Sequence, residues 1–150
     1  MACFFRGSVT NYFCLLLCFA PFLSLTGCGS GQIAAPSIQA QTQHFDDALS
    51  KMKSKDYAGA KEAATAALSG PGLSADQVVE ASMILIEAAL ETKDLETADS
   101  KLSEVEGVAT DMGKVCVLRG RFWRKKGDET QAQKSFQDAR LHDPNVLIPN

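Results

Sequence analysis

The sequence predicts an all-α protein in which three antiparallel helix pairs stack as a short solenoid. Apolar residues recur at helical spacing from about residue 44 onward, glycine and aspartate interrupt that spacing, and no segment alternates as a strand would. The 150-residue chain fits one folded domain behind an N-terminal extension. We assign the folded domain to residues 44–150.

An uncharged apolar run occupies residues 13–25, and Arg6 is the only charged residue before it. A run of about thirteen residues is short for crossing a hydrocarbon core of ~30 Å, but it is typical of the apolar part of an export signal. Burial as a core helix is the alternative, and Pro21 argues against it. We therefore predict that residues 1–27 are a signal peptide.

The run ends in Leu25-Thr26-Gly27-Cys28, which resembles the lipobox of bacterial lipoproteins. The resemblance implies that the Cys28 thiol receives a diacylglycerol group and that Cys28 becomes the first residue of an exported protein facing the periplasm. Gly29 is compatible with sorting to the outer membrane. Each buried CH₂ adds ~0.8 kcal/mol of membrane affinity, so two or more acyl chains such as palmitate would anchor the protein firmly.

The five cysteines fit this interpretation. Cys3, Cys14 and Cys18 would leave with the signal peptide, and Cys28 would carry lipid. Cys116 would then be the only free thiol of the mature chain, so no intramolecular disulfide is expected. We predict that Cys116 is a small buried hydrophobe rather than a metal or redox group.

Residues 28–43 are the predicted lipidated N-terminus and flexible linker. Residues 29–43 have no charge and are mainly Gly, Ser, Gln, Ala and Pro. A flexible segment of this length has a root-mean-square reach of ~20 Å, which would hold the domain just off a bilayer. The C-terminal end of the segment can join the first helix.

Six helices are expected in the domain, at residues 43–54, 57–69, 75–92, 95–106, 111–126 and 129–141. Glycines stand at the expected helix ends, at Gly70, Gly72, Gly107 and Gly127. Polar residues precede the helices: Asp56 and Asp94 as N-caps, and Ser74 with Gln77 and Asp128 with Gln131 at the spacing of capping boxes.

One pattern, which recurs three times, arranges the helices in pairs. An aspartate at a helix start is followed four residues later by an alanine, at Asp56–Ala60, Asp94–Ala98 and Asp128–Ala132. The intervals are 38 and 34 residues, and the loop at residues 70–73 accounts for the longer one. The alanines would let the two helices of a pair approach closely, and about three stacked pairs are the usual minimum for stability.

The third pair resembles a tetratricopeptide repeat (TPR) over its whole length. The matching residues are Gly120, Trp123, Gly127, Asp128, Ala132, Phe136, Ala139, Asp143 and Pro144. The second pair matches through Leu85, Ala89, Asp94, Ala98 and Leu102, and the first through Ala48, Asp56, Tyr57, Ala60, Ala64 and Ala67. The resemblance covers about two thirds of the chain. It implies a concave surface, formed by the first helix of each pair, that binds other proteins.

The sequence contains no catalytic or metal-binding constellation. His44 and His142 stand at opposite ends of the domain, with no cysteine or acidic cluster at ligand spacing. We expect no enzyme activity, no metal and no cofactor. The net charge of −3 becomes −4 without the signal peptide and its Arg6, which does not favour nucleic acid as a partner.

Two rows of opposite charge fall on the predicted concave surface. The basic row is Lys114, Arg121, Arg124 and Lys125, and the acidic row is Glu80, Glu87 and Glu91. Two interpretations remain open. Either the rows pair with each other across neighbouring helices, where each exposed pair contributes ~0–1 kcal/mol, or some arginines stay free to bind a carboxylate of a partner.

The chain ends in the apolar tail Val146-Leu147-Ile148-Pro149. The tail either folds back over the last pair or stays exposed for dimerisation or docking.

The whole sequence therefore predicts a membrane-tethered scaffold or assembly factor in the bacterial cell envelope. Its partners would be membrane lipid, through Cys28, and other envelope proteins, through the two charged rows. A module that binds a small anionic ligand or peptide in a basic concave groove is the alternative. The sequence leaves the oligomeric state open.

Overall fold

The computed structural model describes the backbone of residues 35–149 and the side chains of residues 39–149, within the compact unit Gln32–Asn150. The described part is all-α, as predicted, with six helices and no strand. The helices are α1 (Ala35–Lys53), α2 (Tyr57–Leu68), α3 (Ala75–Glu91), α4 (Leu95–Val105), α5 (Met112–Lys126) and α6 (Glu129–His142). The predicted signal peptide and Cys28 lie outside the described residues.

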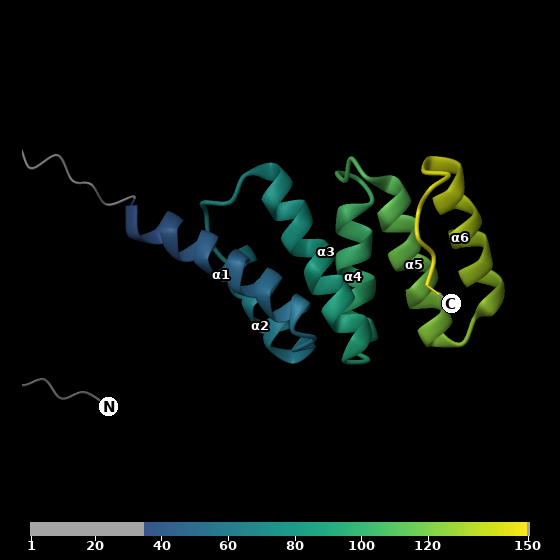
Figure 1. Ribbon diagram of the computed structural model, residues 1–150, viewed down its shortest axis with the longest axis horizontal. Helices are drawn as coiled ribbons and strands as arrows, with labels where there is room; N and C mark the ends of the chain where they lie inside the picture. Colours follow the sequence, from purple (N-terminus) through teal and green to yellow (C-terminus); the bar gives the residue numbers. More distant parts are fainter. Residues whose placement is uncertain (1–34, 150) are drawn as a thin grey trace, which may run out of the picture. The chain divides into compact units, whose positions relative to one another are not determined.

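The six helices form three antiparallel hairpins that follow one another in chain order (Figure 1). The hairpins are α1–α2, α3–α4 and α5–α6. The first helix of each later hairpin packs against both helices of the hairpin before it: α3 contacts α1 and α2, and α5 contacts α3 and α4. This packing is compatible with a helical solenoid, as the fold prediction required.

The three turns inside the hairpins share one hydrogen-bonded structure. The residue before the capping aspartate has a left-handed backbone, with φ of 61° at Lys55, 61° at Lys93 and 89° at Gly127. Its N–H donates to the carbonyl three residues back, at 3.1, 3.3 and 3.1 Å respectively. The next N–H donates five residues back, at 2.9, 2.8 and 3.0 Å. These bonds satisfy carbonyls that the end of a helix leaves without partners.

The aspartates after these turns cap the second helix of each hairpin, as predicted. Oδ1 of Asp56, Asp94 and Asp128 accepts from the N–H three residues later, at 3.0, 3.2 and 3.0 Å. The full capping box predicted at Asp128 is only half formed, because the Asp128 N–H donates to the Trp123 carbonyl of the turn instead. At Ser74 both bonds of the box are present.

Helix α1 begins at Ala35, whereas the sequence predicted a start at residue 43. The last nine residues assigned to the linker are therefore helical. Within this extension, the side chain of Gln41 reaches the end of α2. With the amide nitrogen turned toward that end, Gln41 donates to the carbonyls of Ala66 at 2.7 Å and Ala67 at 2.9 Å. The contact ties the extension of α1 to the first hairpin.

The buried apolar residues form three clusters. The first joins α1, α2 and α3 and consists of Phe45, Ala48, Ala63, Ala64, Ala67, Ala81, Ile84 and Leu85. The second joins α3, α4 and α5 and consists of Met83, Ile86, Ala89, Leu90, Ala98, Leu102, Val105, Val115, Leu118 and Phe122. The third lies within the last hairpin and consists of Val117, Ala132, Phe136 and Ala139.

The last hairpin also depends on Gly120. A Cβ at this position would clash with the ring of Phe136. The absence of a side chain therefore lets α5 approach α6 closely, a role that the sequence had suggested for the alanines of the repeat pattern and not for Gly120.

Candidate interaction surface

Arg121 of α5 binds two glutamates of α3 at once. Its Nη1 lies 2.8 Å from Oε1 of Glu87, and its Nη2 lies 2.6 Å from Oε1 of Glu91. Lys125, one helical turn further along α5, places Nζ 3.3 Å from Oε2 of Glu91. Because residues four apart share a face of a helix, the two pairs of side chains meet across the α3–α5 contact. This charged network links the second and third hairpins.

Hydrogen bonding outweighs burial at both ends of this network. Burial by itself would raise the pKa of Glu91, but hydrogen bonds from Arg121 and Lys125 hold that pKa below its ordinary value of 4.5. Burial by itself would lower the pKa of Arg121, yet its bonds to Glu87 and Glu91 raise it. Both partners are therefore charged at neutral pH, and each stabilises the charge of the other.

The two rows predicted on the concave surface thus pair across neighbouring helices at their centre. Arg121, Lys125 and Glu87 are engaged with one another or with Glu91. In this structure Arg121 is therefore paired within the chain and not free for a partner carboxylate. Because Arg121 and Lys125 are already paired, a small anion that binds these two cations would have to compete with Glu87 and Glu91.

Arg124 does not lie with the rest of the basic row. Its Nη1 donates to the Pro149 carbonyl at 2.9 Å, and its guanidinium lies 4.8 Å from the centroid of the Phe136 ring. Its Nε is 3.7 Å from Oε2 of Glu129. Residues three apart are neighbours on a helix, so the different directions of Arg121 and Arg124 follow from their partners rather than from their spacing. Arg124 therefore contacts the last hairpin and the tail, and it does not pair with the acidic row on α3.

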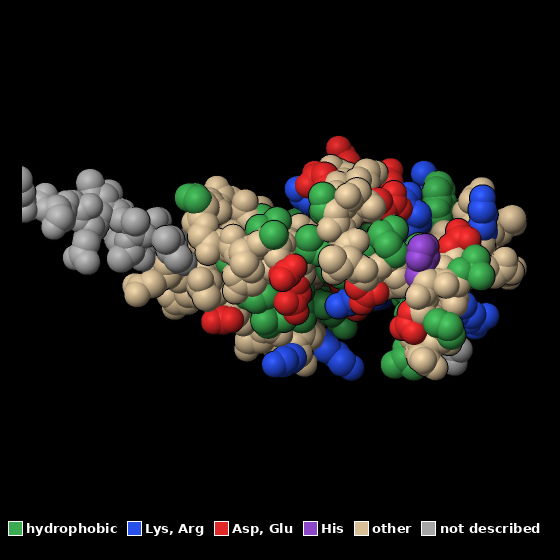
Figure 2. Space-filling model, turned by 90° about the horizontal axis from the view of Figure 1, so that it is seen from above, with side chains coloured by type: hydrophobic (Ala, Val, Ile, Leu, Met, Phe, Trp, Pro, Cys, Tyr) green, Lys and Arg blue, Asp and Glu red, His purple; other side chains and the backbone are tan. Residues whose placement is uncertain are grey.

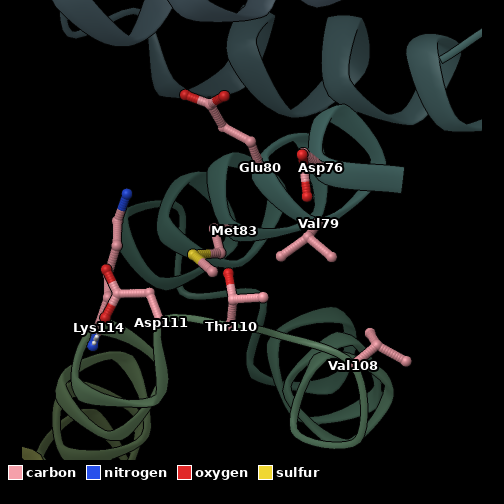
Figure 3. A pocket seen from close by; sticks show the side chains of 8 residues that line it. All are labelled: Asp76, Val79, Glu80, Met83, Val108, Thr110, Asp111 and Lys114. Carbon is pink, nitrogen blue, oxygen red and sulfur yellow. Dashed lines mark hydrogen bonds between the residues drawn. The ribbon is translucent and has the colours of Figure 1, made fainter. Parts of the chain in front are cut away.

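A hollow of about 210 Å³ lies where the first half of α3 faces the start of α5 (Figure 3). Apolar side chains from α3 and the α4–α5 loop line it, namely Val79, Met83 and Val108. Polar side chains surround these, namely Asp76, Glu80, Thr110, Asp111 and Lys114. In Figure 3, Met83 and Thr110 point toward each other, whereas the Glu80 carboxylate extends away from the centre.

The hollow brings together Glu80 and Lys114, two residues predicted as part of the partner-binding surface. Both are exposed, and neither forms an ion pair among the described residues. They therefore differ from Arg121 and Lys125, whose charges are used within the chain. Of the predicted surface residues, these two keep a charge that faces solvent next to apolar side chains.

The sequence did not indicate Val108 or Asp111 as parts of this surface. Val108 is 66% exposed in the loop before α5, where helical spacing gives no signal. Asp111 caps α5, with Oδ1 accepting from the Lys114 N–H at 3.0 Å. A capping aspartate before residue 112 could have been found from the same logic that identified Asp56 and Asp94.

A second ion pair, which the sequence did not suggest, joins Arg119 of α5 to Glu106 at the end of α4. Lys61 of α2 makes the corresponding link between the first two hairpins, with Nζ 3.0 Å from Oδ2 of Asp94. Pairs of this kind depend on how the hairpins stack. No spacing within one helix could have identified them.

Cys116 packs against the third apolar cluster, as expected of a small hydrophobe, but it is half-buried and not fully buried as the sequence predicted. Burial raises the pKa of its thiol above the ordinary value, and the nearby carboxylates of Asp138 and Glu106 add to this rise. A raised pKa keeps the thiol protonated and weakly nucleophilic at neutral pH.

Acidic and basic side chains lie next to one another over the central helices, with no large single patch of either sign in this view (Figure 2). No helix of the described residues is long and apolar enough to cross a membrane. Within the same residues, no group of three or more His, Cys, Asp or Glu side chains could hold a metal ion.

No protein-family model matches the chain, and no curated protein or solved structure has significant similarity to it.

Proposed function

We propose that this chain is a lipid-anchored scaffold of TPR type that binds other proteins of the bacterial cell envelope. The observation that supports the proposal most is the stack of three hairpins with identical turns, in which α1, α3 and α5 lie in sequence. Repeat arrays of this kind offer extended surfaces for protein partners. The lipobox-like residues 25–28 and the preceding apolar run support the membrane anchor.

The partner would bind at the hollow between α3 and α5. Its apolar side chains can bury partner surface, and Glu80 and Lys114 can make polar contacts that give specificity. The charged network of Arg121 is instead assigned to holding the hairpins together, because its groups are already paired. The alternative, a small anionic ligand bound by Arg121 and Lys125, would require these pairs to open.

The anchor is tested by lipid labelling of the full chain in a bacterial host. We expect an alkyne-bearing fatty acid to label the wild type and the protein to sediment with membranes. Cys28→Ser should lose the label and leave the membrane fraction, whereas the matched control Cys116→Ser should keep both. Equal labelling of Cys28→Ser and the wild type would refute the proposed lipid site.

The partner site is tested by crosslinking in native membranes followed by mass spectrometry. We expect Lys114→Glu with Glu80→Lys to lose a protein that the wild type captures, because the charges facing the partner are exchanged. Lys134→Glu is the control, since Lys134 is exposed on α6, outside the hollow. Capture of the same proteins by all three chains, each folded by circular dichroism, would exclude the hollow as the binding site.

A further inference from the structure

The C-terminal tail, residues 143–149, lies along the last hairpin. After α6 the chain turns at Asp143, whose carbonyl accepts from the Val146 N–H at 3.1 Å and whose Oδ1 accepts from the Asn145 N–H at 2.9 Å. The tail then runs back beside α5 and α6 (Figure 1). Val146 and Ile148 pack against the third apolar cluster, as the fold-back prediction required. Leu147, between them, is 89% exposed.

This alternation is that of an extended peptide, in which every second side chain points to the same side. The main chain is held as well, because Arg124 donates to the Pro149 carbonyl. The Phe136 ring and the Glu129 carboxylate hold the guanidinium in place. Because Arg124 binds a main-chain carbonyl, this hydrogen bond does not depend on which residue stands at position 149. The two apolar side chains, Val146 and Ile148, therefore determine which peptide sequences fit the groove.

The tail occupies a position that helices occupy elsewhere in the molecule. Helix α3 packs on both helices of the first hairpin and α5 on both helices of the second, whereas a short extended segment covers the third. The cover is incomplete. A hollow of about 340 Å³ remains beside Ile148, lined also by Arg124, Glu129, Gln133, Phe136, Gln137 and Arg140. A segment held by two side chains and few bonds opens easily.

We propose that the groove between α5 and α6 is a peptide-binding site, occupied by the chain's own tail until an extended segment of a partner displaces it. The partner segment carries β-branched apolar residues two positions apart, as Val146 and Ile148 are. The inference rests on the proposed function only in that the chain binds other proteins. It is independent of the lipid anchor and of the hollow between α3 and α5.

The test uses the full chain and a fluorescent peptide with the sequence of residues 143–150. Val146→Asp with Ile148→Asp is designed to release the tail, because it removes both side chains that pack on the third apolar cluster and puts polar groups against that cluster. We expect this variant to bind the peptide with a Kd on the order of 0.1–1 mM by fluorescence anisotropy. The wild type should bind at least about tenfold more weakly, because its own tail competes at a high effective concentration.

Two controls identify what the groove recognises. A peptide with Val146→Asp and Ile148→Asp should not bind, whereas a peptide with Leu147→Asp should bind like the parent, since Leu147 points to solvent. Arg124→Gln in the released chain should weaken binding of every peptide. If the aspartate pair unfolds the hairpin, Val146→Ser with Ile148→Ser releases the tail without adding charge.

Three results would overturn the proposal. The first is equal affinity of the wild type and the released chain for the peptide. The second is an affinity that the substitutions in the peptide do not change. The third is dimerisation of the released chain without peptide binding. The last result would assign the groove to a second copy of the chain. None of these outcomes depends on lipidation or on envelope partners, so they are distinguishable from failure of the proposed function.

Discussion

The two joints between hairpins are built in different ways. At the first joint, five of the eight residues in the buried cluster are alanines, and Lys61–Asp94 is the ion pair across it. At the second joint, two of ten are alanines, and the forked pairing of Arg121 and the Arg119–Glu106 pair cross it. Small residues bring backbones close together, whereas large ones fill a wider space. The first joint should therefore be sensitive to added volume, and the second to lost volume and lost charge.

The largest expected effect is at the second joint, where Phe122 is 2% exposed and meets Trp123 edge-on at 5.2 Å between ring centroids. Phe122→Ala should lower the free energy of unfolding by about 3–5 kcal/mol, because it leaves a cavity in the cluster. Urea denaturation measures this change. The exposed Val108→Ala is the control and should stay within about 0.5 kcal/mol of the wild type.

At the first joint, Ala64→Leu tests added volume. Ala64 is fully buried, so we expect a loss of about 1–3 kcal/mol from overpacking. The same substitution at exposed Ala58, on the same helix, should change stability little. If Ala64→Leu were as stable as the wild type, the helices of this joint would have more space than the alanine-rich cluster suggests.

The ion pairs offer a third comparison. Arg121→Gln should cost about 1–2 kcal/mol, because it removes two charge-assisted bonds and leaves Glu87 and Glu91 facing each other. Lys61→Gln should cost less than about 1 kcal/mol, since both members of its pair are about one third exposed. Thermal melting of each variant and the wild type measures these two losses of stability. At a higher salt concentration both losses should be smaller, because salt screens the ion pairs.

The pH dependence of stability should reveal the same difference. Because the folded-state pKa of Glu91 lies below 4.5, its contribution is present above that pH and is lost as the pH falls through the lowered pKa. Between about pH 5 and pH 3, the wild type should therefore lose more stability than Arg121→Gln does. Parallel curves for the two proteins would contradict the assigned role of Arg121.

The smallest effect tests the hairpins themselves rather than the joints. Lys93 and Gly127 have the same left-handed turn, but only glycine adopts that backbone without steric cost. Lys93→Gly should stabilise the chain by about 0.5–1 kcal/mol, and Gly127→Ala should destabilise it by a similar or larger amount. A loss of stability in Lys93→Gly would mean that the lysine side chain contributes more than its backbone costs.

The sequence predicted the fold better than the surface, and the reason is the range of the interactions. Aspartate caps, glycine stops and helical spacing act within a few residues, so the six helices and their pairing could be read directly. The contact of Gln41 with the end of α2 could not be predicted, because it exists only where the two helices pack together. The pairing of Arg121 and the different direction of Arg124 depend on how neighbouring helices stack and where the tail lies. The charge pattern left both arrangements open.

The recurring turn sets how far each hairpin can vary in length. Its two main-chain bonds and its cap span a fixed number of residues, so one added residue would break all three at once. The loops between hairpins carry no such recurring turn. Residues 69–74 and 106–111 form loops of equal length, so the change of the repeat interval from 38 to 34 residues does not come from the loop at residues 70–73, as the sequence suggested. It comes from the helices and turns, because α4 and α5 are shorter than α2 and α3. Insertions accepted during evolution, or made by design, therefore belong in residues 69–73 and 107–110, where new surface can be added without changing the hairpins.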